Sequence, residues 1–435
     1  MQKKQDKTGL VWFRNNLRVH DNTVLDSAIA ENKTVIAAFF FDPRHFQNTH
    51  YGFKKTEKYR AQFLIQTIHE LRTNLKNLNI ELFVFKAKPE LIINQLIFDH
   101  NITKVYLQKE WTSEENHVLN LVNNNLPSNL EFDEYFDQFL YHPDDLKLAF
   151  SELPLLFTDF RKVVERTAVV RPSTTTKSVY SNSTAENTTK IPNLKDLGFE
   201  NFKTATDTAF PFKGGENSAI NRLNNYLFET KKIGNYKNTR NELIGKDFSS
   251  KFSAWLANGS ISARTIYWNI KQFEKDNFKN QSTYWLIFEL IWRDFFKYMS
   301  LKYNNSFFRI EGILNKSQDW ITDQNAIRSW VNGSTRSPFV NANMIELKKT
   351  GWMSNRGRQN VASFFAKELK IDWRIGAAYF ESLLIDYDVH SNYGNWMYLA
   401  GVGNDPRNRM FNMELQSKKY DPQGHYQNLW LQQNR

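Results

Sequence analysis

The stretch from 353 to 410 places charged side chains within an otherwise apolar, helix-like sequence that includes the loop DVHSNYGNW. Charges among core-like residues need partners, so they form either an internal ion-pair network or part of a ligand site. The small and amide side chains of the loop favour close approach of its backbone to a ligand. The charged residues of this stretch are Arg356, Arg358, Asp372, Arg374, Asp386 and Asp388.

A second group of chemically active residues lies in the helix-like run STYWLIFELIWRDFFKYMS. Glu289, Trp292 and Arg293 stand at i, i+3 and i+4, which places them on one face of a helix. Core packing explains the phenylalanines of this run. It explains the embedded Glu289 and Arg293 less well, because buried polar groups require partners or a ligand.

A third group is the polar loop DFSSKFS at 247–253, which precedes the helix-like AWLANG. Clustered hydroxyls and backbone N–H groups at the start of a helix form an anion site. An ordinary N-cap by one serine would produce the same local pattern, so both readings stay open at this point.

The elements that must position these groups fall into two parts, of which the first alternates strands and helices. Helical patterns follow Asp21-Asn22 and cover 56–78, 89–100 and 114–125, with Pro89 suited to a helix start. This alternation predicts an α/β domain with a doubly wound parallel sheet, and no dinucleotide or P-loop fingerprint follows any strand. The predicted strands are GLVWF, TVIAAFFF, IELFVF, TKVYLQ and LEFDEY.

From Gly215 onwards the pattern is helical, and ten of the 12 tryptophans lie in this half, which predicts an all-α domain with an aromatic core. The segment Thr167–Lys190 has 11 serines or threonines in 24 residues and reads as a surface connector, with phosphorylation as an alternative use. We therefore expect an α/β domain over 1–140, an interdomain linker over 141–215 and a helical domain over 216–435.

Composition limits the classes of function. The 435 residues include no cysteine, which excludes disulfide scaffolds, cysteine nucleophiles, thiolate zinc sites and iron–sulfur clusters. Aromatic residues make up 15% of the chain, too many for a disordered protein. The net charge of +11 fits a polyanionic partner or simply solubility. Without a signal-peptide core or a long apolar span, a soluble cytoplasmic protein with no membrane association is expected.

Taken together, these segments resemble the photolyase/cryptochrome family almost from end to end. The run LVWFRNNLRVHDNTVL is similar to the N-terminal signature of that family. Tyr236-x-x-x-Arg240 with FSSKFSAWLANGSISAR resembles its flavin-phosphate loop, and FELIWRDFF together with 353–410 resembles its flavin and lesion sites. Within the family, the resemblance is to the cryptochrome-DASH branch, on the strings TRNELIG, DFSSKFS, MSNRGRQNVASF, GVGNDPRNRMFN and KKYDPQGHYQNLWL.

The resemblance implies FAD in the helical domain, 5,10-methenyltetrahydrofolate as antenna in the α/β domain, and light-driven repair of cyclobutane pyrimidine dimers in single-stranded DNA. A signalling photoreceptor with the same cofactor is the alternative, and a light-independent, flavin-binding structural DNA protein is a third reading. The chain ends at Arg435 without the long tail of many signalling relatives, which favours repair. A monomer is expected.

Carried over by position, the resemblance implies a phosphate-binding group and a ring-binding group for FAD. Asn392 matches the position facing flavin N5, where a neutral amide tolerates a reduced, anionic flavin. The phosphate group is Tyr236, Ser249, Ser250, Phe252 and Ser253. The ring group is Arg293, Arg358, Asp386, Asp388 and Asn392. Glu110, after the strand TKVYLQ, matches the carboxylate that binds the folate, although a surface carboxylate there is also common.

The resemblance also assigns an electron relay and a lesion pocket. Trp396, Trp373 and Trp320 match the relay tryptophans, each of which could otherwise be ordinary core. Gln359 and Tyr398 replace the Met and Trp that duplex-repairing relatives usually carry, which favours single strands. The implied substrate contacts are Glu289, Trp292, Asn355, Gln359 and Tyr398, with Arg240 and Arg356 for phosphates.

Neither repair of the (6-4) photoproduct nor iron–sulfur chemistry is expected. NRGRQN at 355–360 contains no histidine, so repair of the (6-4) photoproduct is not implied. His142 and His390 are isolated in the sequence and read as structural or solvent-facing. The absence of cysteine excludes the iron–sulfur branch of the family, and no metal site is expected.

Overall fold

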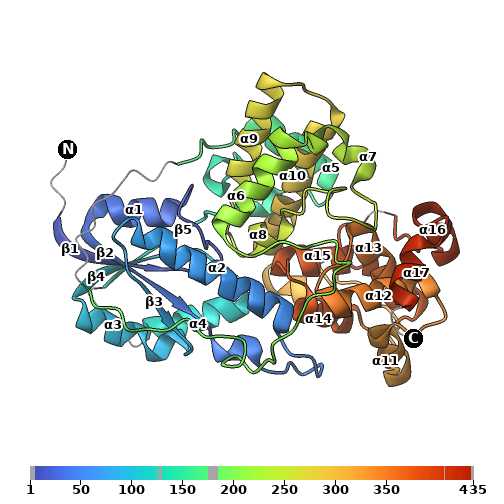
Figure 1. The fold of residues 1–435 in the computed structure, drawn as a ribbon, viewed down its shortest axis with the longest axis horizontal. Coiled ribbons are helices and arrows are strands. Elements are labelled where there is room, and N and C mark those ends of the chain that lie inside the picture. Colours follow the sequence, from blue (N-terminus) through green and yellow to red (C-terminus); the bar gives the residue numbers. More distant parts are fainter. Residues whose placement is uncertain (1–4, 125, 127–129, 175–184, 406, 433–435) are drawn as a thin grey trace.

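In the computed structural model, which describes residues 5–124, 126, 130–174, 185–405 and 407–432, five strands form one parallel sheet. Their order across the sheet is β3-β2-β1-β4-β5, so the connections run outward in both directions from β1 (Figure 1). This confirms the predicted doubly wound sheet and its five strands. The strands are β1 (Gln5–Trp12), β2 (Asn32–Phe40), β3 (Leu82–Phe85), β4 (Ile102–Gln108) and β5 (Glu131–Tyr135).

Helices cover both faces of the sheet because successive strand residues alternate sides. Val11 faces the cluster packed by α1 (Thr23–Glu31) and α2 (Lys58–Lys76). Leu10 faces the cluster packed by α3 (Ile93–Asp99) and α4 (Ser113–Asn123). Asn22 caps α1 by accepting a hydrogen bond from the Leu25 N–H at 3.2 Å.

The rest of the described chain is helical, as predicted from Gly215 onwards, and its core includes five buried tryptophans. Two π-helical segments, Asn225–Glu229 and Phe364–Glu368, interrupt the α-helices. The helices are α5 (Phe157–Thr167), α6 (Glu216–Asn224), α7 (Tyr236–Thr239), α8 (Ser253–Ala257), α9 (Ala263–Asp276), α10 (Gln281–Tyr303), α11 (Gln324–Asn332), α12 (Pro338–Thr350), α13 (Asn355–Ser363), α14 (Trp373–Leu383), α15 (Val389–Ala400), α16 (Met413–Tyr420) and α17 (His425–Gln432). Short 3-10 turns lie at Pro43–Phe46, Pro89–Leu91, Pro143–Asp145, Phe150–Glu152, Lys232–Asn235 and Asn304–Phe308.

The segment expected to be a linker is partly built into the fold. Helix α5 buries Phe160 against Phe295 of α10, with ring centroids 5.3 Å apart. Residues 175–184 of the serine- and threonine-rich connector lie outside the described residues. Beyond them, Thr189 Oγ1 accepts a hydrogen bond from the Val84 N–H at 3.0 Å, so the connector covers the edge strand β3. The boundaries at 140 and 215 stay a prediction.

A buried charge cluster joins the sheet to the helices. Arg18, in the loop after β1, pairs with Asp137 at 2.5 Å and donates to the Gly259 carbonyl at 3.1 Å. Arg264 of α9 pairs with Asp21 at 2.9 Å and with Asp137 at 2.8 Å. Because each buried charge has an opposite partner, the cluster ties the two parts together without leaving an uncompensated charge.

Within the described ranges, no helix combines the length and the apolar character that crossing a membrane requires.

Candidate functional site

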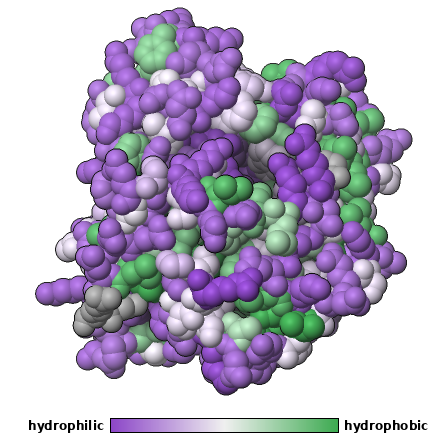
Figure 2. Space-filling view, turned by 90° about the vertical axis from the view of Figure 1, so that its right-hand side faces the viewer, coloured by the Kyte–Doolittle hydropathy of each residue, from purple (hydrophilic) through white to green (hydrophobic). Residues whose placement is uncertain are grey.

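A cavity of about 310 Å³, which we call the central cavity, lies between α10, α13, α15 and Arg240, the residue that follows α7. The face that contains the right-hand helices of Figure 1 is hollowed in the space-filling view (Figure 2). All five predicted lesion-pocket residues line the central cavity, together with Arg240 and Arg293. The lining residues are Arg240, Phe288, Glu289, Trp292, Arg293, Phe296, Asn355, Gln359, Ser391, Asn395, Tyr398 and Leu399.

Aromatic rings form one wall of the central cavity. Trp292 stacks on Phe157 of α5, with ring centroids 3.7 Å apart and planes 8° from parallel. On its other side it meets Tyr398 edge-on, at 6.1 Å and 87°. Trp292 is thus held rigidly from behind, and together with Tyr398 it offers two ring surfaces at right angles, suited to a flat aromatic or heterocyclic ligand.

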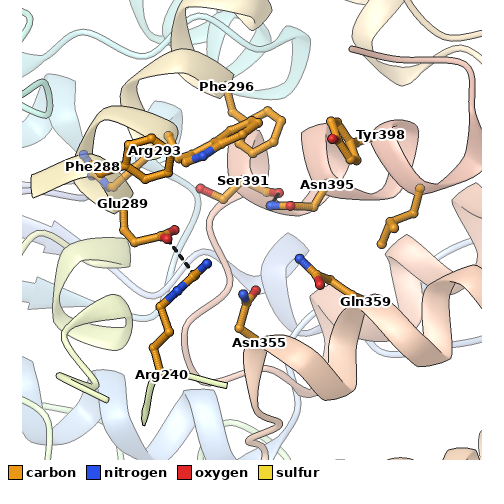
Figure 3. Close-up of a pocket in the computed structure, with 12 residues that line it drawn as sticks. Arg240, Phe288, Glu289, Arg293, Phe296, Asn355, Gln359, Ser391, Asn395 and Tyr398 are labelled. Carbon is orange, nitrogen blue, oxygen red and sulfur yellow. Dashed lines mark hydrogen bonds and ion pairs between the residues drawn. The ribbon is translucent and has the colours of Figure 1, made fainter. Parts of the chain in front are cut away.

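Polar groups line the opposite side, where Glu289, Arg240, Asn355 and Gln359 converge (Figure 3). Arg240 Nη1 and Glu289 Oε1 are 2.6 Å apart. Burial raises the pKa of the Glu289 carboxyl, and the Arg240 charge opposes this rise. The amides of Asn355 and Gln359 add hydrogen-bond donors and acceptors on α13. This side of the cavity can therefore hydrogen-bond to the polar edge of a ring, while the aromatic side contacts the faces of the ring.

The remaining predicted phosphate contact, Arg356, lies elsewhere. Its guanidinium sits over the ring of Tyr420, 4.7 Å from the centroid, and it is not among the residues that line the central cavity. Adjacent residues on a helix point about 100° apart, so Asn355 and Arg356 of α13 face different surroundings.

The loop predicted to bind phosphates is organised by Arg222, which sequence reasoning missed. This buried arginine donates to the carbonyls of Lys246, Ser249 and Ser250 at 3.1 Å each and pairs with Asp247 at 2.9 Å. Its guanidinium holds the loop carbonyls in place, which fixes the backbone at the start of α8. No spacing rule links residues 25 positions apart, so the local sequence carries no signal for this role.

The predicted phosphate residues differ in exposure. Tyr236, Ser250 and Phe252 are buried, Ser249 is half-buried, and Ser253 is exposed at the first position of α8. Burial raises the pKa of the Tyr236 hydroxyl well above its usual range, so this group stays neutral.

The predicted ring group lies between α13, α14 and α15. Arg358 Nη2 pairs with Asp386 Oδ2 at 3.0 Å, while the buried Asp386 Oδ1 has no hydrogen-bond partner within the described chain. Asn392 is buried and donates to the Ala377 carbonyl at 3.0 Å. A buried carboxylate oxygen without a partner fits a ligand that donates a hydrogen bond there, as the ring N–H of a flavin would.

Two further ring-group residues are bound to protein partners. Arg293 donates to the carbonyls of Gln138 at 2.5 Å and Leu256 at 3.1 Å, which joins α10 to the sheet loop and to α8. Asp388 caps α15 and pairs with Lys297 at 2.9 Å. Although burial alone raises the pKa of Asp388, the charges of Lys297 and Arg293 hold that pKa well below its usual range. Lys297 stands four residues after Arg293, so helical spacing could have identified it as a second cation on the same face of α10.

Two of the predicted relay tryptophans, Trp396 and Trp373, are buried on adjacent helices. Trp373 begins α14 and donates its indole N–H to the Ile310 carbonyl at 3.1 Å. Gly376, one turn later, lies directly against the Trp396 indole, since a Cβ at 376 would come within 2.2 Å of its ring. Glycine is therefore required for the close approach of α14 to Trp396.

The third tryptophan, Trp320, is half-buried. Ile321 pairs with Ile371 in a short parallel bridge, and the Ile321 N–H donates to the Lys370 carbonyl at 2.8 Å. This bridge brings Trp320 alongside the start of α14. Two of the three indoles are therefore buried, and the third, Trp320, is half-buried next to the segment that leads into α14.

Glu110 lies at the carboxyl end of β4 and is buried. It accepts hydrogen bonds from Gln108 Nε2 at 2.8 Å and Asn15 Nδ2 at 3.4 Å. Burial raises the pKa of Glu110, against the charges of Lys297 and Arg14. Glu115, which sequence reasoning missed, has its pKa raised to about 7 by burial and by Glu110. The buried Glu110 after β4 and the half-buried Glu115 in the first turn of α4 can accept hydrogen bonds from an amino-bearing heterocycle.

Both isolated histidines have structural surroundings, as expected. His390 is buried and stacks on Trp111 at 4.5 Å, and its Nδ1 lies 3.0 Å from Ser300 Oγ. His142 Nδ1 accepts a hydrogen bond from the Asp144 N–H at 3.2 Å.

Comparisons with known proteins agree over nearly the whole chain. The family model "DNA photolyase" matches residues 9–177, and "FAD binding domain of DNA photolyase" matches residues 285–435. The chain is 46% identical to Cryptochrome DASH of Gloeobacter violaceus, over 98% of this chain and 85% of that protein. It is 44% identical to Cryptochrome DASH of Xenopus laevis, over 96% of this chain and 81% of that protein.

Solved structures show the same likeness. A Synechocystis sp. cryptochrome matches with a TM-score of 0.93 and 43% identity, covering 99% of this chain and 90% of that one. An archaeal photolyase from Sulfolobus tokodaii, solved with two FAD molecules, matches with a TM-score of 0.77 and 26% identity, covering 98% of this chain and 90% of that one.

The buried Lys297–Asp388 pair leads to a pH-dependent prediction. Lys297→Met leaves a buried carboxylate without its cation, so the free energy of unfolding should fall by about 3–5 kcal/mol at pH 7. The pKa of Asp388 then rises, and proton uptake relieves the unpaired charge. The deficit should therefore shrink between pH 7 and pH 5, where wild-type Asp388 stays ionised.

Urea unfolding at both pH values measures this deficit. Lys271→Met, which removes a partly exposed pair with Glu274, is the matched control and should cost no more than about 1 kcal/mol. A Lys297→Met deficit that is equal at the two pH values would contradict the pairing.

Proposed function

The chain belongs to the photolyase/cryptochrome family, in its cryptochrome-DASH branch, and from this premise we propose that it repairs cyclobutane pyrimidine dimers with light, preferentially in single-stranded DNA. The observation that carries the proposal is the central cavity, where two aromatic faces oppose a group of carboxylate, amide and guanidinium side chains. Such a cavity suits a flipped pyrimidine pair, whose rings are flat and whose edges carry donors and acceptors.

The helical part carries the FAD-binding domain of the family, and the side chains present fit that cofactor. Reduced FAD, excited by light, would supply one electron to the dimer and recover it after the cyclobutane ring opens. Arg358 and Asp386 would hold the ring system, with the free Asp386 Oδ1 accepting from it. The loop at 247–253, held by Arg222, would bind the phosphates, with Tyr236 beside it.

In this proposal five residues of the central cavity have a defined task. Trp292, held against Phe157, contacts one face of the dimer, and Tyr398, at a right angle to Trp292, contacts an adjoining side. Glu289 and Asn355 accept and donate hydrogen bonds at the base edges, and Arg240 neutralises the adjoining phosphate.

Preference for single strands follows from the cost of base flipping. Extruding a dimer from a duplex costs a few kcal/mol, which a single strand largely avoids. Gln359 and Tyr398 occupy the positions where duplex-repairing relatives usually have Met and Trp, and both line the central cavity. We also propose that the enzyme is a monomer.

Trp396, Trp373 and Trp320 would pass electrons inward to reduce oxidised FAD. Trp396 and Trp373 are buried on the adjacent helices α15 and α14, and Trp320 is half-buried beside the bridge that leads into α14, which supports this role. A signalling photoreceptor would need the same three indoles, so it remains the second candidate.

We also propose that Glu110 binds the antenna, 5,10-methenyltetrahydrofolate. Its burial at the carboxyl end of β4, where parallel sheets form ligand crevices, supports this role. The Sulfolobus tokodaii photolyase, solved with two FAD molecules, makes a second flavin the rival occupant.

Repair assays test the main proposal. The reduced protein should restore a dimer-containing oligonucleotide under blue light, and the matching duplex should react at least about tenfold less efficiently, as a flipping cost above 1.4 kcal/mol requires. Equal repair of both substrates would overturn the single-strand preference. Bound, photoreducible FAD without any repair would establish the photoreceptor instead.

Replacement of the innermost indole tests the relay. Trp396→Phe should slow photoreduction of oxidised FAD by about tenfold or more, a barrier increase of at least about 1.4 kcal/mol, because phenylalanine is far harder to oxidise. Trp430→Phe, which alters a buried tryptophan in a separate cluster, should leave the rate unchanged. Transient absorption measures both, and an unchanged rate in Trp396→Phe would remove it from the relay.

Reconstitution with folate tests the antenna. The wild-type protein should gain a near-ultraviolet absorption band from the bound folate, and Glu110→Ala should lose it while retaining FAD. Glu200→Gln, at an exposed loop position, is the control. If the wild-type protein gains no such band, or only a second flavin spectrum, the folate assignment fails.

A further inference from the structure

A second cavity, of about 180 Å³, lies where the loop after α7 meets the turn between α16 and α17, and we call it the outer cavity. It is smaller than the usual site of a drug-sized ligand, which suggests room for a single ring. Exposed Ile244 and Phe248 contribute apolar surface. Its lining residues are Glu242, Leu243, Ile244, Phe248, Tyr420, Asp421, Pro422, Gln423, His425 and Tyr426.

The outer cavity adjoins the central cavity along two stretches of chain. Arg240 lines the central cavity, and Glu242, two residues later, lines the outer one. On α13, Asn355 lines the central cavity, while the next residue, Arg356, covers the ring of Tyr420 in the outer cavity. Two residues of extended chain span about 7 Å, so the two openings are close neighbours.

Positive charge gathers on the surface between the two cavities. Arg356 lies 4.7 Å, and Lys419 5.4 Å, from the centroid of the Tyr420 ring. Burial lowers the pKa of Arg356, the Tyr420 hydroxyl opposes this shift, and the neighbouring charges of Arg240 and Arg409 add to it. Guanidinium groups held near one another are stabilised by an anion between them, and a phosphodiester has the matching charge and geometry.

The polar rim of the outer cavity suits a nucleobase. Glu242, Gln423 and His425 are exposed and offer donors and acceptors to a base edge. The Asp421 carboxylate is already engaged by the backbone N–H groups of Tyr426 and Gln427, at 3.0 Å each, so it shapes the turn rather than the ligand contact.

We propose that the outer cavity binds the base of a nucleotide next to the lesion in single-stranded DNA, packed against the part of the Tyr420 ring that lines this cavity and that Arg356 leaves uncovered, with the intervening phosphate held by Arg356. The proposal rests on the proposed function, because it places the lesion in the central cavity. A base that is paired in a duplex cannot enter the outer cavity. Flanking-base capture therefore adds to the preference for single strands beyond the cost of flipping the dimer.

Binding to short synthetic DNAs tests the proposal with the full-length protein. The probes are a labelled dimer dinucleotide, and the same dimer flanked on each side by one nucleotide that carries either a base or an abasic sugar. Wild-type protein should bind the base-flanked probe about tenfold tighter than the abasic one, the order expected for one base–aromatic stack. Tyr420→Ala should abolish this difference, and Tyr420→Phe, which keeps the ring, should retain it.

Controls separate stacking from damage to the fold. Tyr267→Ala removes another half-buried tyrosine, with Lys271 5.3 Å from its ring centroid, outside both cavities, and should behave like wild type. Equal affinity of the wild-type protein for base-flanked and abasic probes would overturn the proposal and leave the outer cavity to another partner, such as a protein side chain. The proposal would also be overturned if Tyr420→Ala lowered the affinity for the bare dimer dinucleotide as much as it lowered the affinity for the base-flanked probe.

A failure of the proposed function would give a different result from a failure of this inference. The protein would then not bind the bare dimer, whereas Tyr420→Ala would still lower its affinity for an undamaged single strand.

Discussion

Helix α10 carries three charged side chains into an apolar interior, and the surrounding structure is arranged to satisfy them. Asp294 accepts the backbone N–H groups of Leu140 and Tyr141, which follow the sheet. Arg293 donates to carbonyls on both the sheet side and α8, and Lys297 pairs with the residue that caps α15. Leaving any of these groups unpaired would cost several kcal/mol, so α10 has one orientation that the fold permits. The position of every neighbouring helix follows from that orientation.

The binding surface is a consequence of this constraint. With α10 held in place, its i, i+3 and i+4 positions turn Glu289, Trp292 and Arg293 toward α13 and α15, where Gln359 and Tyr398 complete the wall. The same helix thus anchors the interior with Asp294 and Lys297 and faces a ligand with Glu289 and Trp292, while Arg293 takes part in both. An interior rich in phenylalanine and tryptophan can therefore also present a polar site. The charged residues within the apolar sequence of α10 connect that site to the rest of the fold.

Much of this arrangement is predictable from the sequence, because periodicity is local. Alternating strands and helices indicate the sheet, and helical spacing together with family motifs brings the central cavity residues together. Contacts between residues far apart in the sequence are harder to predict from it. Arg356 turns toward Tyr420, the last residue of α16, and no motif encodes that contact. Arg222 acts on a loop 25 residues away. A composition rich in serine and threonine is the same for a connector that is surrounded by water and for one that packs on the protein. The contact of Thr189 with the edge strand β3 could therefore not be predicted from it.

The buried cluster of Arg18, Asp21, Asp137 and Arg264 has a consequence for light collection. Transfer of excitation energy between two chromophores depends steeply on their separation and on the angle between their transition dipoles. If one pigment is held at the end of β4 and another among the helices, a flexible tether between the two halves would average both quantities. Four interlocked charges remove that freedom, so the separation and angle of two such pigments would be set by side chains that touch neither of them.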